Sequence, residues 1–295
     1  MASAPLRIAP DIPLGIRFAP VPEDLGELVN TFFVATAPGE RIEEMLPAYS
    51  AQFFVLLDGA AALNDDEPDA GRSILCTAPL LEAMPFTLHG PAHLVGASLT
   101  PLGWHCLSGL PADEVNNRLV AVEDLLTKDE FSELESHAAS GSAGESIAAK
   151  IFGCISDILR QRRHRLDDGH MDFVARVTEW LSSSLDPKLH ELHGRMTISE
   201  RTAQRLCRRY FGVPPTALVK RFRAIRAAML LANPGLSEEK RDEILQAYFD
   251  QAHLIRDIRR YTGRTPTSLA DKNLTANSLD PEGHGPSARI LRENP

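Results

Sequence analysis

The strongest constraint on this chain is an internal repeat near its C-terminal end. The phrase Arg209-Tyr-Phe-Gly-Val-Pro-Pro215 returns 51 residues later as Arg260-Tyr-Thr-Gly-Arg-Thr-Pro266. A glycine just after a helix adopts the left-handed conformation that stops it, and a following proline keeps the helix from resuming. The repeat therefore predicts two helices that end in the same way.

The two predicted helices also begin alike. Ser199 and Asp250 are favourable N-cap residues, and apolar residues follow each of them at helical spacing. The apolar positions are Ala203, Leu206 and Tyr210 in the first helix, and Leu254, Ile258 and Tyr261 in the second. Residues 187–198 and 237–249 supply a preceding helix and turn for each, and residues 216–232 read as a helix that joins the two units. Helix, short turn and second helix is the helix-turn-helix plan.

The first of the two helices carries a polar face suited to DNA. Arg201, Gln204, Arg205 and Arg208 lie at positions i, i+3, i+4 and i+7, so they share one side of the helix. Arginine and glutamine side chains pair with guanine and adenine edges in the major groove. This face predicts a recognition helix.

The distribution of charge supports a nucleic-acid partner although the whole chain has a net charge of −9. Residues 1–160 hold 8 basic and 23 acidic residues, whereas residues 161–295 hold 23 basic and 17 acidic ones. Between Arg195 and Arg226 there are nine basic residues and one acid. Such asymmetry between halves is typical of a protein with one nucleic-acid-binding part.

The pattern predicts an α+β chain of two domains. Residues 1–110 read as a β-rich sensor, a small barrel or sandwich, because short apolar runs such as 52–58 and 93–100 alternate with turn signals. Apolar residues then recur at helical spacing in 112–126, 128–139 and 145–161, so residues 111–161 form a helical segment. We expect a polar linker at 162–170, an all-α DNA-binding domain at 171–272 and a mobile tail at 273–295.

Residues 171–270 resemble the DNA-binding domain of the AraC/XylS family. The resemblance is strongest from Tyr248 to Pro266, and the stretch Ser199–Arg205 resembles the start of the first recognition helix. The stretch from Val95 to Val115 resembles, more weakly, the cupin-type sensor domain found upstream in such regulators. By this resemblance, Arg201, Gln204 and Arg205 occupy base-reading positions of the first helix. Those of the second helix are Gln251, Ala252, Ile255 and Arg256.

The remaining arginines near the helix ends are expected to hold phosphates: Arg208 and Arg209 in the first motif, Arg259 and Arg260 in the second. Two departures from the family pattern concern the second motif. Ala247 stands where family members have glycine, and Glu243 stands where a small residue is expected at a close helix crossing. Burying an unpaired carboxylate is costly. We therefore expect asymmetric use of the motifs, with the first dominating base readout.

The sequence predicts neither an enzyme nor a metal protein. His89, His93 and His105 lack the tight His-x-His spacing of metal cupins, and the four cysteines form no CxxC pair. A small barrel without a metal triad offers an apolar cavity, so the expected ligand is a small organic effector, with no cofactor. Two alternatives stay open: a cupin-like enzyme, or a degenerate family member whose second motif binds a protein.

The expected function is a sequence-specific transcription regulator that reads two successive major grooves of double-stranded DNA. Residues 145–161 are predicted to carry homodimer contacts, and RNA polymerase is a further candidate partner. No stretch of about twenty apolar residues exists to span a membrane. The N-terminus also lacks the features of a secretory signal, so we expect the protein in the cytoplasm.

Overall fold

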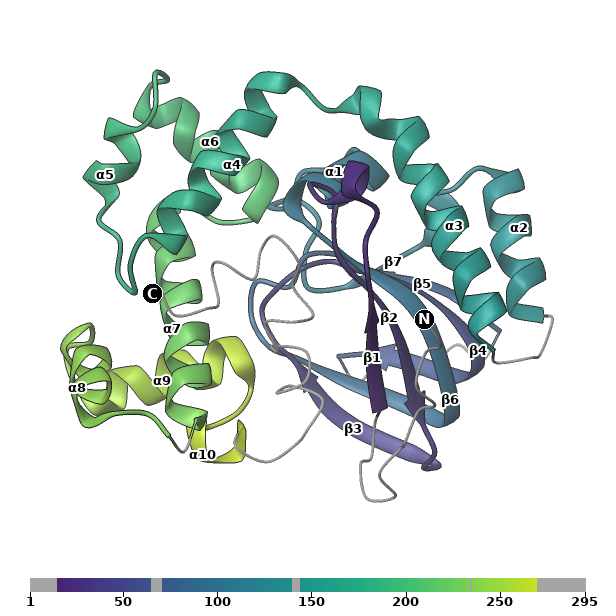
Figure 1. Ribbon diagram of the computed structural model, residues 1–295, viewed down its shortest axis with the longest axis horizontal. Helices are drawn as coiled ribbons and strands as arrows, with labels where there is room; N and C mark the ends of the chain where they lie inside the picture. The colour runs from purple at the N-terminus through teal and green to yellow at the C-terminus, as the bar shows by residue number, and fades with distance from the viewer. Residues whose placement is uncertain (1–14, 65–70, 140–143, 234, 270–295) are drawn as a thin grey trace, which may run out of the picture.

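The computed structural model describes residues 15–64, 71–139, 144–233 and 235–269 (Figure 1). An antiparallel β-sheet with covering helices comes first, and an all-helical region follows it. This arrangement confirms the predicted α+β class. The predicted tail at 273–295 lies outside the described residues.

A strongly coiled sheet forms the N-terminal region, with its described strands in the order β1-β2-β6-β4-β5-β7 and β3 paired to β6. Every pairing is antiparallel, and the long strand β6 pairs with β3 along its first half and with β2 along its second half. The strands are β1 Gly15–Ala19, β2 Val29–Ala37, β3 Arg41–Leu46, β4 Gln52–Leu63, β5 Ile74–Thr77, β6 Met84–Leu99 and β7 Leu119–Val120. Short 3-10 turns at Glu23–Leu25 and Val122–Asp124 connect parts of this region.

Alternation along β4 divides the apolar side chains of the sheet between two cores. Phe53 and Val55 belong to the core that the sheet shares with the helices, whereas Phe54 and Leu56 belong to a second core inside the coiled sheet. Successive side chains of a strand point to opposite faces, so one apolar run serves both cores. The apolar run at 52–58 was correctly predicted as a strand, although its continuation to Leu63 was not.

The first α-helix begins eleven residues before the first helix that the sequence pattern predicted. Helix α1 spans Pro101–Ser108, where the side chain of Thr100 accepts a hydrogen bond from the Gly103 N–H and Gly109 stops the helix at φ +72°. The predicted helix at 112–126 was wrong. Asn117 takes a left-handed φ of +51°, and strand β7 and a 3-10 turn occupy the rest of this range. Its apolar residues reach the core from irregular backbone.

Helices α2 (Lys128–Ala139) and α3 (Glu145–Arg162) lie where they were predicted. The apolar stripe of α3 packs on the sheet, where the ring of Phe152 stacks on Phe32 at 4.7 Å between centroids. The segment expected as a polar linker contains the end of α3, a 3-10 turn at Arg163–Arg165 and the start of α4. Arg162 is buried there and donates to the carbonyls of Leu107 and Leu125.

The C-terminal region consists of α4 Asp168–Ser182, α5 Leu189–Gly194, α6 Glu200–Phe211, α7 Pro215–Ala232, α8 Glu238–Gln246, α9 Gln251–Thr262 and α10 Pro266–Leu269. Gly212 and Gly263 stop α6 and α9 at φ +78° and +68°, which confirms the prediction from the repeat. Figure 1 shows α6 near one end of the long helix α7 and α9 beside its other end. No helix among the described residues is long and apolar enough to cross a membrane.

Candidate nucleic-acid interface

Helix α6 presents one exposed basic face. The Ser199 side chain accepts a hydrogen bond from the Thr202 N–H and so caps the helix. Ala203, Leu206 and Tyr210 are buried, which turns the opposite side of the helix outward. Four predicted DNA-contacting residues lie exposed on that side: Arg201, Gln204, Arg205 and Arg208. They line a surface hollow whose other edge is formed by Asp113 of the N-terminal region.

Helix α9 is built on the same frame. The Asp250 carboxylate accepts a hydrogen bond of 2.6 Å from the His253 N–H, and Leu254, Ile258 and Tyr261 are buried. The outward side carries Gln251, Ala252, Arg256 and Arg259, all exposed, and the half-buried Ile255.

The repeat allows the two faces to be compared position by position. Arg205 corresponds to Arg256, and Arg208 corresponds to Arg259, so both helices keep these two cations. Arg201 corresponds to Ala252, and Gln204 corresponds to Ile255. The first helix therefore has hydrogen-bonding side chains where the second has apolar ones.

The last arginine of each predicted set points elsewhere. Arg209 is half-buried, and its Nη2 lies 3.3 Å from Nε2 of His105 in α1. Arg260, at the corresponding position, has its Nε 3.8 Å from a carboxylate oxygen of Glu82. Both arginines thus engage the N-terminal region in this arrangement.

The backbone at these two positions is also held by the N-terminal region. The Arg209 carbonyl accepts a hydrogen bond of 2.7 Å from the Ala112 N–H, and the Arg260 carbonyl accepts one of 2.9 Å from the Ala83 N–H. The last carbonyls of a helix have no partner within the helix. The N-terminal region supplies donors to both recognition helices at equivalent points, an arrangement that no sequence pattern indicated.

Close packing at the two helix-stopping glycines completes this docking. A Cβ on Gly212 would lie 2.5 Å from the Leu81 side chain, and a Cβ on Gly263 would lie 2.7 Å from the Met45 side chain. At each of the two positions glycine is therefore needed for two reasons: its backbone has a positive φ, and the neighbouring side chain leaves no space for a Cβ. Further contacts at the α9 end join the Ala48 N–H to the Tyr261 carbonyl and Glu44 to Arg264.

The charged helix α8 does not bury its acids. Glu243 is exposed and lies 2.9 Å from Lys240, while Ile244 is the buried residue of the helix. The structure therefore does not bury the unpaired carboxylate that the sequence had suggested at this helix crossing. Tyr248, just after α8, packs under the guanidinium of Arg223 at 4.5 Å from the ring centroid.

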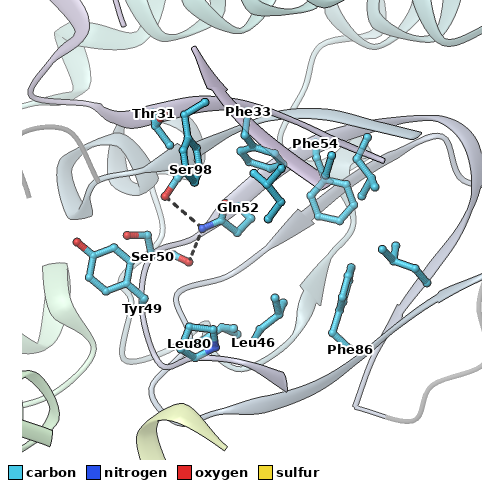
Figure 2. Close-up of a pocket in the computed structure, with 16 residues that line it drawn as sticks. Thr31, Phe33, Leu46, Tyr49, Ser50, Gln52, Phe54, Leu80, Phe86 and Ser98 are labelled. Atoms are coloured by element: carbon cyan, nitrogen blue, oxygen red, sulfur yellow. Dashed lines mark hydrogen bonds between the residues drawn. The ribbon is translucent and has the colours of Figure 1, made fainter. Parts of the chain in front are cut away.

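A cavity of about 100 Å³, partly open to solvent, lies inside the coiled sheet (Figure 2). Its lining is mostly apolar and includes Phe33, Phe54 and Phe86. Polar groups gather at one end, where Gln52 Nε2 donates to Ser98 Oγ at 3.2 Å and to the Ser50 carbonyl at 3.4 Å. No aspartate, glutamate, lysine, arginine or histidine stands among its lining residues in the described part of the chain.

Part of the cavity wall is also part of the docking. Leu46, Pro47, Tyr49 and Leu80 line the cavity. Their immediate neighbours Met45, Ala48 and Leu81 contact the ends of the recognition helices. We call residues 44–49 and 80–83 the docking segments.

Among the described residues, one group offers three potential metal ligands close together: Glu133, His137 and Cys154, with donor atoms within 4.8 Å of one another. Sequence reasoning missed it because the residues come from two helices. Burial, followed by the neighbouring Glu133, raises the pKa of the Cys154 thiol to about 11.

Comparisons with known proteins bear on the helical region. Residues 192–272 match a protein family described as a helix-turn-helix domain. No curated protein matches the chain. Among solved structures, ToxT from Vibrio cholerae in its P21 form is 11% identical, with 80% of this chain and 96% of that chain covered and a TM-score of 0.43. ToxT from Vibrio cholerae O395 is 11% identical, with 80% and 95% covered and a TM-score of 0.44.

The family match contains both glycine-stopped helices, their N-caps, helix α8 and the last residues of α5. It therefore agrees with the helix-turn-helix plan that the repeat predicted and that the structure contains. Residues 192–272 therefore form an AraC-type helix-turn-helix domain that contains two such motifs.

Proposed function

We propose that this chain is a DNA-binding transcription regulator of the AraC type, that it reads two successive major grooves with α6 and α9, and that a ligand in the N-terminal cavity controls this reading. Two recognition helices on one chain would meet DNA about 34 Å, or 10 base pairs, apart on one face. The base-reading set is Arg201, Gln204 and Arg205 in α6, with Gln251, Ala252, Ile255 and Arg256 in α9. Arg208, Arg209, Arg259 and Arg260 would hold phosphates.

One observation carries the proposed control: the docking segments belong both to the cavity wall and to the contacts with α6 and α9. In residues 44–49, Leu46 and Tyr49 line the cavity, while Met45 and Ala48 contact the end of α9. In residues 80–83, Leu80 lines the cavity, while Leu81 contacts the end of α6 and Ala83 contacts the end of α9. A ligand that shifts the wall must shift these contacts, because neighbouring backbone atoms carry both.

The lining favours a neutral and largely apolar effector. Aromatic and aliphatic side chains supply most of the surface, and the amide and hydroxyls of Gln52, Ser50 and Ser98 would pair with one polar end of the molecule. A carboxylate or an ammonium would enter without a counter-charge, which is costly in an apolar site.

The docked arrangement would restrain DNA binding. Arg209 is half-buried against His105, Arg260 lies beside Glu82, and Asp113 borders the hollow beside the basic face of α6. The N-terminal half is strongly acidic, so its proximity opposes the approach of phosphates. Separation of the regions would free both arginines for the backbone of DNA.

A charge-neutral change at a docking contact tests this control. Glu44, which is 9% exposed and paired with Arg264, is changed in Glu44→Gln. Glu43→Gln is the matched control, because Glu43 is the preceding residue of the same strand but is 68% exposed and pairs with Arg41. Affinity is measured by anisotropy on a labelled duplex that the full-length protein has selected from a random library. We expect Glu44→Gln to bind the duplex about 3- to 10-fold more tightly than Glu43→Gln, as loss of about 1 kcal/mol of restraint would give.

Equal affinity of the two variants would overturn the proposal that docking restrains DNA binding. Weaker binding by Glu44→Gln would also overturn it, and would mean that docking positions the helices for DNA. Cavity linkage is tested separately with the neutral apolar dye Nile red. If the dye changes DNA affinity, DNA must change dye affinity by the same factor. The dye is expected to bind wild type and to lose its effect on DNA binding in Glu44→Gln.

Three further parts of the proposal concern assembly and location. The protein would act in the cytoplasm as a homodimer with α3 at the contact, and RNA polymerase would be a partner. The apolar stripe of α3 packs on the sheet, so a dimer contact would use its exposed side, which carries Lys150, Asp157 and Arg160. Sedimentation of Asp157→Lys against wild type tests the dimer, and a monomeric wild type would remove it.

A further inference from the structure

The most exposed large apolar side chain in the described part of the chain stands at the entrance of the second recognition helix. Phe249 is 94% exposed and directly precedes the N-cap Asp250. Its counterpart in the repeat is Ile198, which is 38% exposed and directly precedes the N-cap Ser199. Leaving a phenyl ring in water forgoes the free energy of burial, so this position indicates a contact made outside the chain.

Two further apolar residues continue from Phe249 along the outward side of α9. Ala252 is exposed, and Ile255 is half-buried. Residues three apart are neighbours on a helix surface, so Ala252 and Ile255 follow one another toward the middle of α9, and Phe249 stands two residues before the helix begins. The corresponding positions of α6 hold Arg201 and Gln204. Only the second motif therefore has an apolar reading face.

The surroundings of this face favour DNA over a protein as its partner. Arg256 and Arg259 are exposed beside it, and Gln251 is exposed at the start of the helix. A cationic rim suits a polyanion. The N-terminal residues of a recognition helix are those that reach base edges. In the major groove, the one apolar group that bases present is the thymine methyl.

We propose that the second motif reads thymine methyl groups through Phe249, Ala252 and Ile255, while the first motif reads purines by hydrogen bonds. This inference rests on the proposed entry of α9 into a major groove. Phe249 becomes a specificity-determining residue, although it lies outside the set that the family resemblance implied. The DNA half-site under α9 is then recognised by where its thymines lie.

Replacing thymine by uracil tests the proposal, because it removes the methyl and keeps every hydrogen-bonding group. The probe is a duplex that the full-length protein has selected from a random library, with uracil placed in one half-site at a time. In the α9 half-site we expect affinity to fall about 4-fold for each contacted methyl, the factor that follows from burying one such group. Uracil in the α6 half-site should change affinity less than 2-fold.

Variants then assign the effect to the side chain. Phe249→Ala should weaken binding to the thymine duplex and lose the uracil effect, whereas Ile198→Ala, the matched position of the first motif, should keep it. Uracil without effect in either half-site, on a duplex with both grooves protected, would overturn the proposal. Phe249→Ala with unchanged affinity and unchanged uracil effect would also overturn it and assign the ring to a protein partner. Protection of a single groove would instead contradict the entry of α9 itself.

Discussion

The two helix-turn-helix motifs share a frame and differ in their reading faces. Each recognition helix has an N-cap side chain, a glycine stop and a last-turn carbonyl held by the N-terminal region. On the outward side the first helix has Arg201 and Gln204, and the second has Ala252 and Ile255. Positions that set the fold and the docking recur at 51-residue spacing, while positions that face outward are free to differ.

The surroundings of the two helices differ as well. Tyr210 of α6 lies between His105 of α1 and His170 of α4. Helix α9 packs on α7, where Arg223 lies 3.0 Å from Asp186 and within 4.0 Å of Asp257. The end of α6 thus depends on aromatic contacts with histidines, and α9 depends on ion pairs. The contacts that hold one recognition helix can therefore be weakened while those that hold the other stay intact.

The largest expected effect comes from adding one methyl group at a helix stop. Gly212→Ala introduces strain at φ +78° and a clash with Leu81. Gly109→Ala is the matched control, because Gly109 has φ +72° but no atom within 4 Å of a built Cβ. Strain alone costs about 1 kcal/mol, and the clash adds about 1–3 kcal/mol. Urea unfolding should show a larger loss for Gly212→Ala, and equal losses would mean that Leu81 moves aside freely.

The next effect separates the two reading faces. Arg205→Ala should reduce specific DNA affinity by about 1–3 kcal/mol and relax base preference at one position. Gln251→Ala should cost less than about 1 kcal/mol of specificity, because the second helix reads apolar groups. Both are measured as the ratio of affinities for the selected duplex and a scrambled one. Equal losses of specificity would contradict the asymmetry.

A smaller effect concerns phosphates, where the two motifs should behave alike. Arg208→Ala and Arg259→Ala stand at corresponding exposed positions. Each should weaken binding to all sequences and lower the slope of log affinity against log salt by about 1. Lys128→Ala, an exposed cation on α2, is the control and should leave the slope unchanged. A change of base preference in Arg208→Ala or Arg259→Ala would show that the arginine reads bases.

Local sequence signals predicted the helical region well, because caps, glycine stops and 3.6-residue periodicity all act over a few residues. Helix α6 begins after Ser199 and ends at Gly212 as expected. The error at 112–126 has a physical cause: its apolar residues contact the core from a turn, a short strand and a 3-10 helix. The spacing of apolar residues alone cannot distinguish such irregular backbone from an α-helix.

The docking was beyond sequence reasoning for another reason. Backbone hydrogen bonds such as that from the Ala112 N–H to the Arg209 carbonyl have no side-chain signature. Glu44 and Arg264, which form an ion pair, are 220 residues apart. The charge of Arg209 predicted a phosphate contact, and only its neighbours in space show that His105 faces it. Exposed Phe249 was visible in the sequence, but its exposure depends on how α8 ends.

The smallest expected effect is a pH dependence confined to the α6 end. Burial first, and then the charge of Arg209, lower the pKa of His105, with His170 and Arg165 adding to the decrease. Burial is also the main cause of the lowered pKa of His170. A histidine with a lowered pKa in the folded state binds protons less readily than in the unfolded state. The contribution of these neutral histidines to folding stability is therefore fully present above about pH 6.5, and it decreases as the pH falls below that value.

The contact from Arg209 to His105 Nε2 requires the neutral ring, because an imidazolium would place two cations face to face. Acidification should therefore loosen the docking at α6, while the end of α9, held by Glu44 and Arg264, should hold. Hydrogen exchange followed through peptides around Gly212 and Gly263 measures the two ends separately. We expect faster exchange at the Gly212 end below pH 6.5, after correction for intrinsic rates, and no such change in His105→Gln. Equal acceleration at both ends, or a wild-type response in His105→Gln, would show that this histidine does not control the difference between the motifs.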